Sequence, residues 1–131
     1  MFEAAELPKE KAAFYTLLRQ QACALLEGES DVLANLANLS SLLNISMPQL
    51  NWVGFYILRG DQLVLGPFQG KPACVRIPIG RGVCGTAVKE KKTQRVEDVD
   101  AFPGHIACDA ESRSELVVPC LLYTSPSPRD S

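Results

Sequence analysis

Apolar positions in the first third of the chain recur at helical spacing. Over residues 12–26 they follow the i, i+3, i+4 pattern, and they predict a helix with Pro8 as its first position that stops at Gly28. A second apolar stripe over residues 32–43 predicts another helix, and Ser30 or Asp31 can cap its N-terminus. The sequence therefore predicts that two consecutive helices precede the rest of the fold.

The apolar pattern then changes to alternation typical of strands. The segments "NWVGFYIL" and "QLVLGPF" are separated by "RGD", which predicts a hairpin with Gly60 and Asp61 in its turn. "CVRIPI" predicts a third strand. "GRGVCGTAVKEKK" predicts a short helix with a glycine-rich entry and lysines in its last turn.

Two further short strands are expected in the last third of the chain. "TQRVEDV" and "ELVVPCLL" carry the pattern, and residues 100–114 between them predict a long loop of the kind that often has a function. After Leu122 the composition changes to "YTSPSPRDS", which cannot extend a central strand. We expect residues 123–131 to be a disordered, non-native tail.

Composition narrows the class of protein. With 131 residues, 47% of them apolar, one globular domain is expected. The net charge of −2 argues against a nucleic-acid binder, which usually carries a basic patch. The N-terminus lacks the features of a signal peptide, and no apolar run approaches the ~18 residues of a membrane span. We expect a cytoplasmic protein that does not bind membranes.

Cysteines are the main candidates for chemistry, because cytosolic thiols more often serve redox catalysis or metal binding than structural disulfides. Cys74, Cys84 and Cys108 form the informative set, whereas Cys23 and Cys120 are expected to be buried as small apolar residues. Zinc binding is disfavoured, because the nine residues between the first two cysteines of the set do not form a close C-x2-4-C pair. Redox-active thiols and unreactive reduced thiols remain as alternatives.

Local charge bears on which thiol would attack a substrate. Cys84 lies near the start of a predicted helix and close to Arg81, and both features favour a thiolate. Cys108 has Asp109 and Glu111 as neighbours, which oppose thiolate formation unless Arg113, His105 or backbone donors offset them. On these grounds Cys84 is predicted to have the lower pKa, but local sequence does not decide which thiol is the nucleophile.

Several of these motifs together resemble one enzyme family. "NWVGFYIL", "LVLGPFQGKPACVRIPIGRGVCGTAV", "QRVEDV" and "FPGHIACDAESRSELVVP" closely resemble the free methionine-(R)-sulfoxide reductases, which are built on a single GAF domain. The resemblance covers about residues 10–120. It implies an α+β, GAF-like fold: a central antiparallel sheet with helices packed mainly on one side.

The family's chemistry implies roles for the thiols. Matched positions give Cys108 as the nucleophile, Cys74 as the resolving thiol and Cys84 as a third redox cysteine. The attacking cysteine becomes a sulfenic acid and then a disulfide, which thioredoxin and NADPH reduce. The resemblance implies no bound cofactor or metal.

It also implies a substrate site. Trp52 and Tyr56 match the wall of a pocket for the substrate's methyl group, and Asp109 falls among the substrate-binding residues. Glu115 matches a carboxylate that can hydrogen-bond or protonate the sulfoxide oxygen. Free methionine (R)-sulfoxide and thioredoxin are the expected partners, and a homodimer is one expected assembly.

The C-terminal segment of this chain departs from the family pattern. The family continues after "SELVVP" into a hairpin strand with an acidic D-x-D-type pair and then a C-terminal helix, where this chain has "CLLYTSPSPRDS". Residues 1–122 are therefore expected to be a C-terminally incomplete GAF domain, and the chain as written could be inactive.

The alternative to the reductase function is a non-catalytic GAF module that senses a small ligand.

Overall fold

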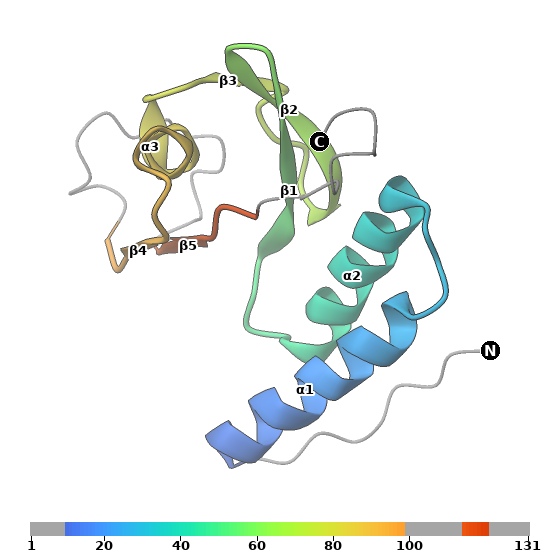
Figure 1. Cartoon of the computed structure of the whole chain (residues 1–131). Coiled ribbons are helices and arrows are strands. Elements are labelled where there is room, and N and C mark those ends of the chain that lie inside the picture. The colour runs from blue at the N-terminus through green and yellow to red at the C-terminus, as the bar shows by residue number, and fades with distance from the viewer. Residues whose placement is uncertain (1–9, 99–113, 121–131) are drawn as a thin grey trace. The chain divides into compact units, whose positions relative to one another are not determined.

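The computed structural model of the chain describes residues 10–98 and 114–120 (Figure 1). Residues 100–113 of the predicted loop and the whole predicted tail, residues 123–131, lie outside these residues. The chain divides into two compact units, residues 1–76 and 77–131, and each is described by itself. Within the described residues, no helix has the length and apolar character needed to cross a membrane.

Two helices form the first layer of the first unit, as the sequence predicts. Helix α1 spans Lys11–Leu26, and the carboxylate of Glu10 caps it by accepting from the main-chain N–H groups of its first turn. Helix α2 spans Val32–Ser46, and Asp31 caps it by accepting from Ala34 N–H at 2.8 Å. The cap that the sequence left open between Ser30 and Asp31 is therefore Asp31.

A β-hairpin forms the second layer of this unit. Strand β1 spans Trp52–Arg59 and pairs antiparallel with β2, Gln62–Gly70, around a turn in which Gly60 has a φ of 65°. Strand β3, Arg76–Pro78, completes a sheet of order β1-β2-β3 and is shorter than the predicted "CVRIPI". The predicted hairpin and its turn are confirmed.

Packing of α2 joins the two layers. It lies between α1 and the hairpin (Figure 1), and the Ser40 hydroxyl donates to Leu36 C=O within the helix and stands 3.3 Å from Pro67 C=O on β2. The hydroxyl is fully buried, and these carbonyls satisfy it. The apolar core of the unit includes three leucines on α1, α2 and β2: Leu18, Leu42 and Leu63.

The second unit is built from one helix and a two-stranded ladder. Helix α3 spans Gly82–Glu90, strand β4 spans Gln94–Val96, and strand β5 spans Glu115–Val117. The strands pair antiparallel, and α3 packs against both. The glycine-rich entry and the lysine in the last turn of α3 agree with the sequence, whereas β5 ends five residues earlier than predicted. The β1–β2 and β4–β5 pairings are antiparallel, and the expectation of an α+β fold is confirmed.

Candidate active site

Three aromatic rings stack on one face of the hairpin in the first unit. The Trp52 indole lies 6.1 Å from the Tyr56 ring and 5.4 Å from the Phe68 ring, centroid to centroid, with interplanar angles of 24° and 16°. Trp52 is therefore the middle ring of the stack. Stacked rings of this kind stabilise one another by more than the burial of their apolar area alone provides.

Strand register explains how the stack forms. Trp52 and Tyr56 share a face of β1, and a bulge lies between Gly54 and Tyr56. Gly54 is directly opposite Phe68, and a Cβ added to this glycine would lie 2.8 Å from Phe68 Cα and still closer to its Cβ. The missing side chain at Gly54 leaves the room that Phe68 occupies beside Trp52.

The indole nitrogen of Trp52 is a buried hydrogen-bond donor. Among the described residues no acceptor reaches Nε1. Leaving a buried donor unpaired costs free energy. A polar acceptor on a bound ligand is one group that could satisfy it.

Cys74 stands beside this stack and is oxidised. The Tyr56 hydroxyl donates to the Cys74 main-chain carbonyl at 2.7 Å, and Cys74 is disulfide-bonded. Cys23, Cys84 and Cys120 are free thiols, so none of the other described cysteines is the partner of Cys74. The structure thus brings together Trp52, Tyr56 and Cys74, three of the residues singled out in the sequence.

Cys84 and Glu115 meet in the second unit. The pKa of the Cys84 thiol is raised to about 11. Burial is the larger cause of this rise, and the charge of Glu115 is the second. The expectation that its surroundings stabilise a Cys84 thiolate is therefore wrong, whereas its comparison with Cys108 falls outside the described residues. Its position near the N-terminus of α3 is as expected, but desolvation of the thiolate outweighs the helix dipole and Arg81.

The prediction that Cys23 and Cys120 are buried is also wrong, because both are exposed. Cys23 lies five positions after the buried Leu18 on α1, about 140° around the helix, and so it faces away from the core. Cys120 follows the end of β5, where the ladder no longer covers it. Apolar neighbours in the sequence did not show which face of each element is covered.

Two of the sequence-predicted site residues, Cys108 and Asp109, lie outside the described residues. Among the residues that are described, no group of three or more His, Cys, Asp or Glu side chains could hold a metal ion. Phe68, which the sequence analysis did not single out, stacks on the candidate site residue Trp52. Its signal was the glycine at the facing position of the hairpin, which becomes visible only once the register is known.

Comparison with known proteins gives the fold a class. The chain is 60% identical to a structure described as a putative GAF sensor protein from Burkholderia vietnamiensis, with a TM-score of 0.81 over 84% of this chain and 70% of that one. A structure of free methionine-R-sulfoxide reductase from Neisseria meningitidis in complex with its substrate is 46% identical. Its TM-score is 0.87 over 92% of this chain and 73% of that one. The fold is that of a GAF domain.

A curated relative adds sequence evidence. The free methionine-R-sulfoxide reductase of Escherichia coli is 58% identical over 112 residues, which are 86% of this chain and 68% of that protein. No family model matches the chain. On the identities above, the chain belongs to the free methionine-R-sulfoxide reductase family, whose members are oxidoreductases.

Proposed function

We propose that this chain reduces free L-methionine (R)-sulfoxide to methionine by thiol chemistry. The observation that carries the proposal is the oxidised state of Cys74, which is disulfide-bonded next to a stacked aromatic cluster while Cys23, Cys84 and Cys120 are free. A disulfide at Cys74 is the state in which a resolving thiol is left after one turnover, before an external thiol reduces it.

Cys108 is the proposed nucleophile. Its thiolate attacks the sulfoxide sulfur and forms a transient S–S bond, while a proton goes to the sulfoxide oxygen. The S–S bond and the substrate's S–O bond then break as the hydroxyl passes to the Cys108 sulfur, where a new S–O bond forms. Methionine leaves, its sulfur reduced by two electrons, and Cys108 is oxidised by two electrons to a sulfenic acid.

Cys74 is the proposed resolving thiol. Its sulfur attacks the sulfenic sulfur, an S–S bond forms, and the oxygen leaves as water. Cys84 is proposed as a third redox cysteine. Its pKa of about 11 keeps it protonated at neutral pH, which supports giving the attacking role to Cys108.

Substrate contacts are assigned by residue type. Trp52 and Tyr56 present apolar ring faces suited to the methyl group of the sulfoxide, and Glu115 supplies a proton to its oxygen. Asp109 binds the polar part of free methionine sulfoxide. No bound cofactor is needed, because both electrons come from thiols.

Recycling requires an external dithiol. Thioredoxin supplies two electrons by thiol–disulfide exchange: the protein's disulfide returns to two thiols, and thioredoxin becomes a disulfide that NADPH-dependent reduction restores to the dithiol. This cycle fits a reducing cytoplasm. A homodimer is proposed as the assembly.

The test is methionine formation by the reduced chain, with each sulfoxide epimer supplied separately. We expect methionine from the (R) epimer, one equivalent without reductant, and continued turnover with thioredoxin and NADPH. Cys74→Ser should still release the first equivalent but should not recycle. No methionine from either epimer, with a chain shown to be folded and reduced, would refute the proposed reaction.

A non-catalytic sensor is the second candidate, favoured by the similarity to a structure described as a putative GAF sensor protein. Counting free thiols before and after addition of methionine sulfoxide separates the two functions. A reductase loses two thiols per turnover, whereas a sensor binds ligand with no change in the count.

A further inference from the structure

The chain segment that carries Cys74 is held to the hairpin by two hydrogen bonds. The Tyr56 hydroxyl donates to Cys74 C=O at 2.7 Å, across 18 positions of sequence. The main-chain N–H of Leu65 donates to Val75 C=O at 2.9 Å. The carbonyls of Cys74 and Val75, which are consecutive in the chain, are therefore both held by hydrogen bonds to the hairpin.

These two donors belong to one rung of the hairpin. Tyr56 on β1 is paired with Leu65 on β2, so the side chain of one residue and the backbone of its partner hold neighbouring peptide groups. The Tyr56 ring is itself held, because it stacks on Trp52. The anchor on Cys74 is therefore attached to a rigid element rather than to a loop.

We propose that Tyr56 is a positioning residue for Cys74: its hydroxyl holds the cysteine's main chain on the hairpin so that the thiol is already in place to form its disulfide. This role rests on the proposed function only in that Cys74 is taken as the resolving thiol. It differs from forming a pocket wall, which uses the ring face and not the hydroxyl.

The physical reason is the effective concentration of the thiol. A cysteine whose backbone is anchored searches fewer conformations before it meets its partner, so less freedom is lost when the S–S bond forms. Removal of the anchor leaves the ring and its packing but gives the reduced segment more freedom. The disulfide then becomes easier to reduce.

Tyr56→Phe tests the proposal, because it removes one oxygen atom and keeps the ring. The variant and the wild-type chain are equilibrated with dithiothreitol at a series of ratios, and the fraction of Cys74 that is oxidised is measured by alkylation and mass spectrometry. We expect the equilibrium constant to shift about fivefold towards the reduced form, the size of one net hydrogen bond. For a two-electron couple this is ~20 mV.

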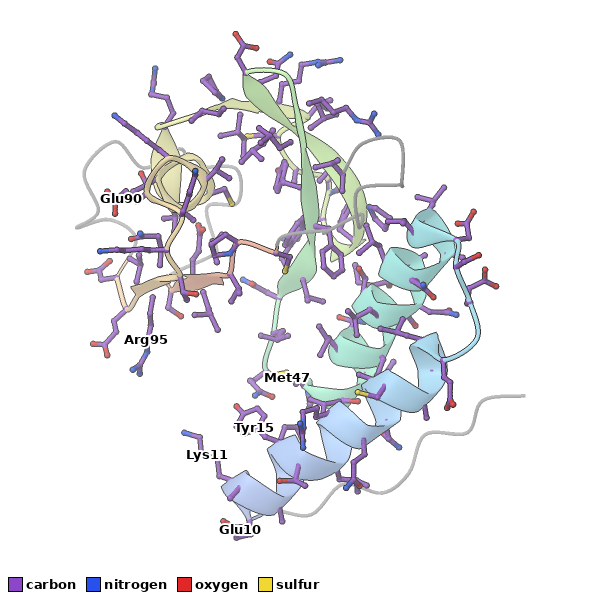
Figure 2. All side chains as sticks on the ribbon, in the orientation of Figure 1. Glu10, Lys11, Tyr15, Met47, Glu90 and Arg95 are labelled. Atoms are coloured by element: carbon purple, nitrogen blue, oxygen red, sulfur yellow. The ribbon has the colours of Figure 1, made fainter. Side chains whose placement is uncertain are left out.

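Tyr15→Phe is the matched control. Tyr15 lies on α1 with 45% of its surface exposed (Figure 2), and its ring contacts Phe14. Loss of its hydroxyl should leave the potential of the Cys74 disulfide as in the wild-type chain. A Tyr56→Phe potential equal to that of the wild type would overturn the positioning role.

A measurement on the wild-type chain guards against a variant that folds poorly. If the hairpin holds the segment, the amide of Leu65 should keep its protection from hydrogen exchange within about twofold when the disulfide is reduced. Loss of protection by about tenfold or more on reduction would show that the disulfide, and not the hairpin, holds the segment. That result would also overturn the proposal.

The outcomes separate this proposal from the proposed function. A shifted potential in Tyr56→Phe, together with no methionine from the wild-type chain, would keep the positioning role and reject the reductase activity. Methionine formation by the wild-type chain, together with an unshifted disulfide potential in Tyr56→Phe, would keep the reductase activity and reject the positioning role.

Discussion

Glu115 on β5 raises the pKa of the Cys84 thiol on α3, in addition to the larger effect of burial. The helix and the strand pack within the second unit, where β5 pairs with β4 through Glu115 and Val96. A negative charge beside a buried thiol disfavours the thiolate. Cys84 is therefore a protonated thiol at neutral pH, although it stands near a helix N-terminus.

This pKa predicts how stability depends on pH. Below about pH 9 the Cys84 thiol is protonated in both folded and unfolded chains, so its contribution to stability is complete. Between the ordinary value of 9.0 and the folded value of about 11 the unfolded chain ionises first, and the free energy of unfolding falls. The loss should reach ~2–3 kcal/mol. Urea unfolding at pH 8 and pH 11 measures it, and Cys84→Ser should lack this part of the dependence.

Glu115→Gln should lower turnover by about 100-fold or more, because the amide cannot donate a proton to the sulfoxide oxygen. The same change should lower the pKa of Cys84, which alkylation rates against pH would report. Glu97→Gln is the matched control. Glu97 is 3.7 Å from Arg95 and both side chains are largely exposed, so its loss should change neither quantity. Normal turnover in Glu115→Gln would leave that carboxylate without a role in proton transfer.

Cys108→Ser should abolish methionine formation even in the first turnover, because a serine hydroxyl cannot form the sulfenic acid. Cys23→Ser removes an exposed thiol from α1 and serves as the control, with wild-type release expected. Rapid-quench measurement of methionine in the absence of reductant decides the question. A full first equivalent from Cys108→Ser would assign the attack to another thiol.

Trp52→Ala should raise KM more than it lowers kcat, since a pocket wall contributes binding shared by substrate and transition state. Steady-state kinetics over a range of sulfoxide concentrations measure both constants. A main effect on kcat would instead assign Trp52 to the chemical step.

Gly54→Ala should destabilise the first unit by about 1–3 kcal/mol, because the new Cβ overlaps Phe68 across the hairpin. Emission from Trp52, the one tryptophan of the chain, should shift as its stacking partner moves. Gly28→Ala is the comparison: its φ is 82° and its added Cβ meets nothing within 4 Å. That variant should lose about 1–2 kcal/mol from backbone strain alone and keep the native emission.

Much of the local structure could be predicted from the sequence. Apolar spacing predicted α1 and α2, alternation predicted the β1–β2 hairpin, and Gly60 marked its turn. These features are encoded within a few residues of one another, because helix and strand periods and turn conformations are local properties. The motifs around the cysteines also consist of neighbouring residues, so the sequence alone was enough to indicate the family.

Only the tertiary structure decided the state of individual side chains. Cys84 has the local features of a reactive thiol, yet burial and Glu115, thirty-one positions away, raise its pKa. Cys23 has apolar neighbours along the chain but faces solvent. The bond from Tyr56 to Cys74 and the stacking of Phe68 on Trp52 depend on strand register, which joins residues distant in sequence. Solvation and partner geometry are set by what packs around a side chain, so the pattern along the chain cannot give them.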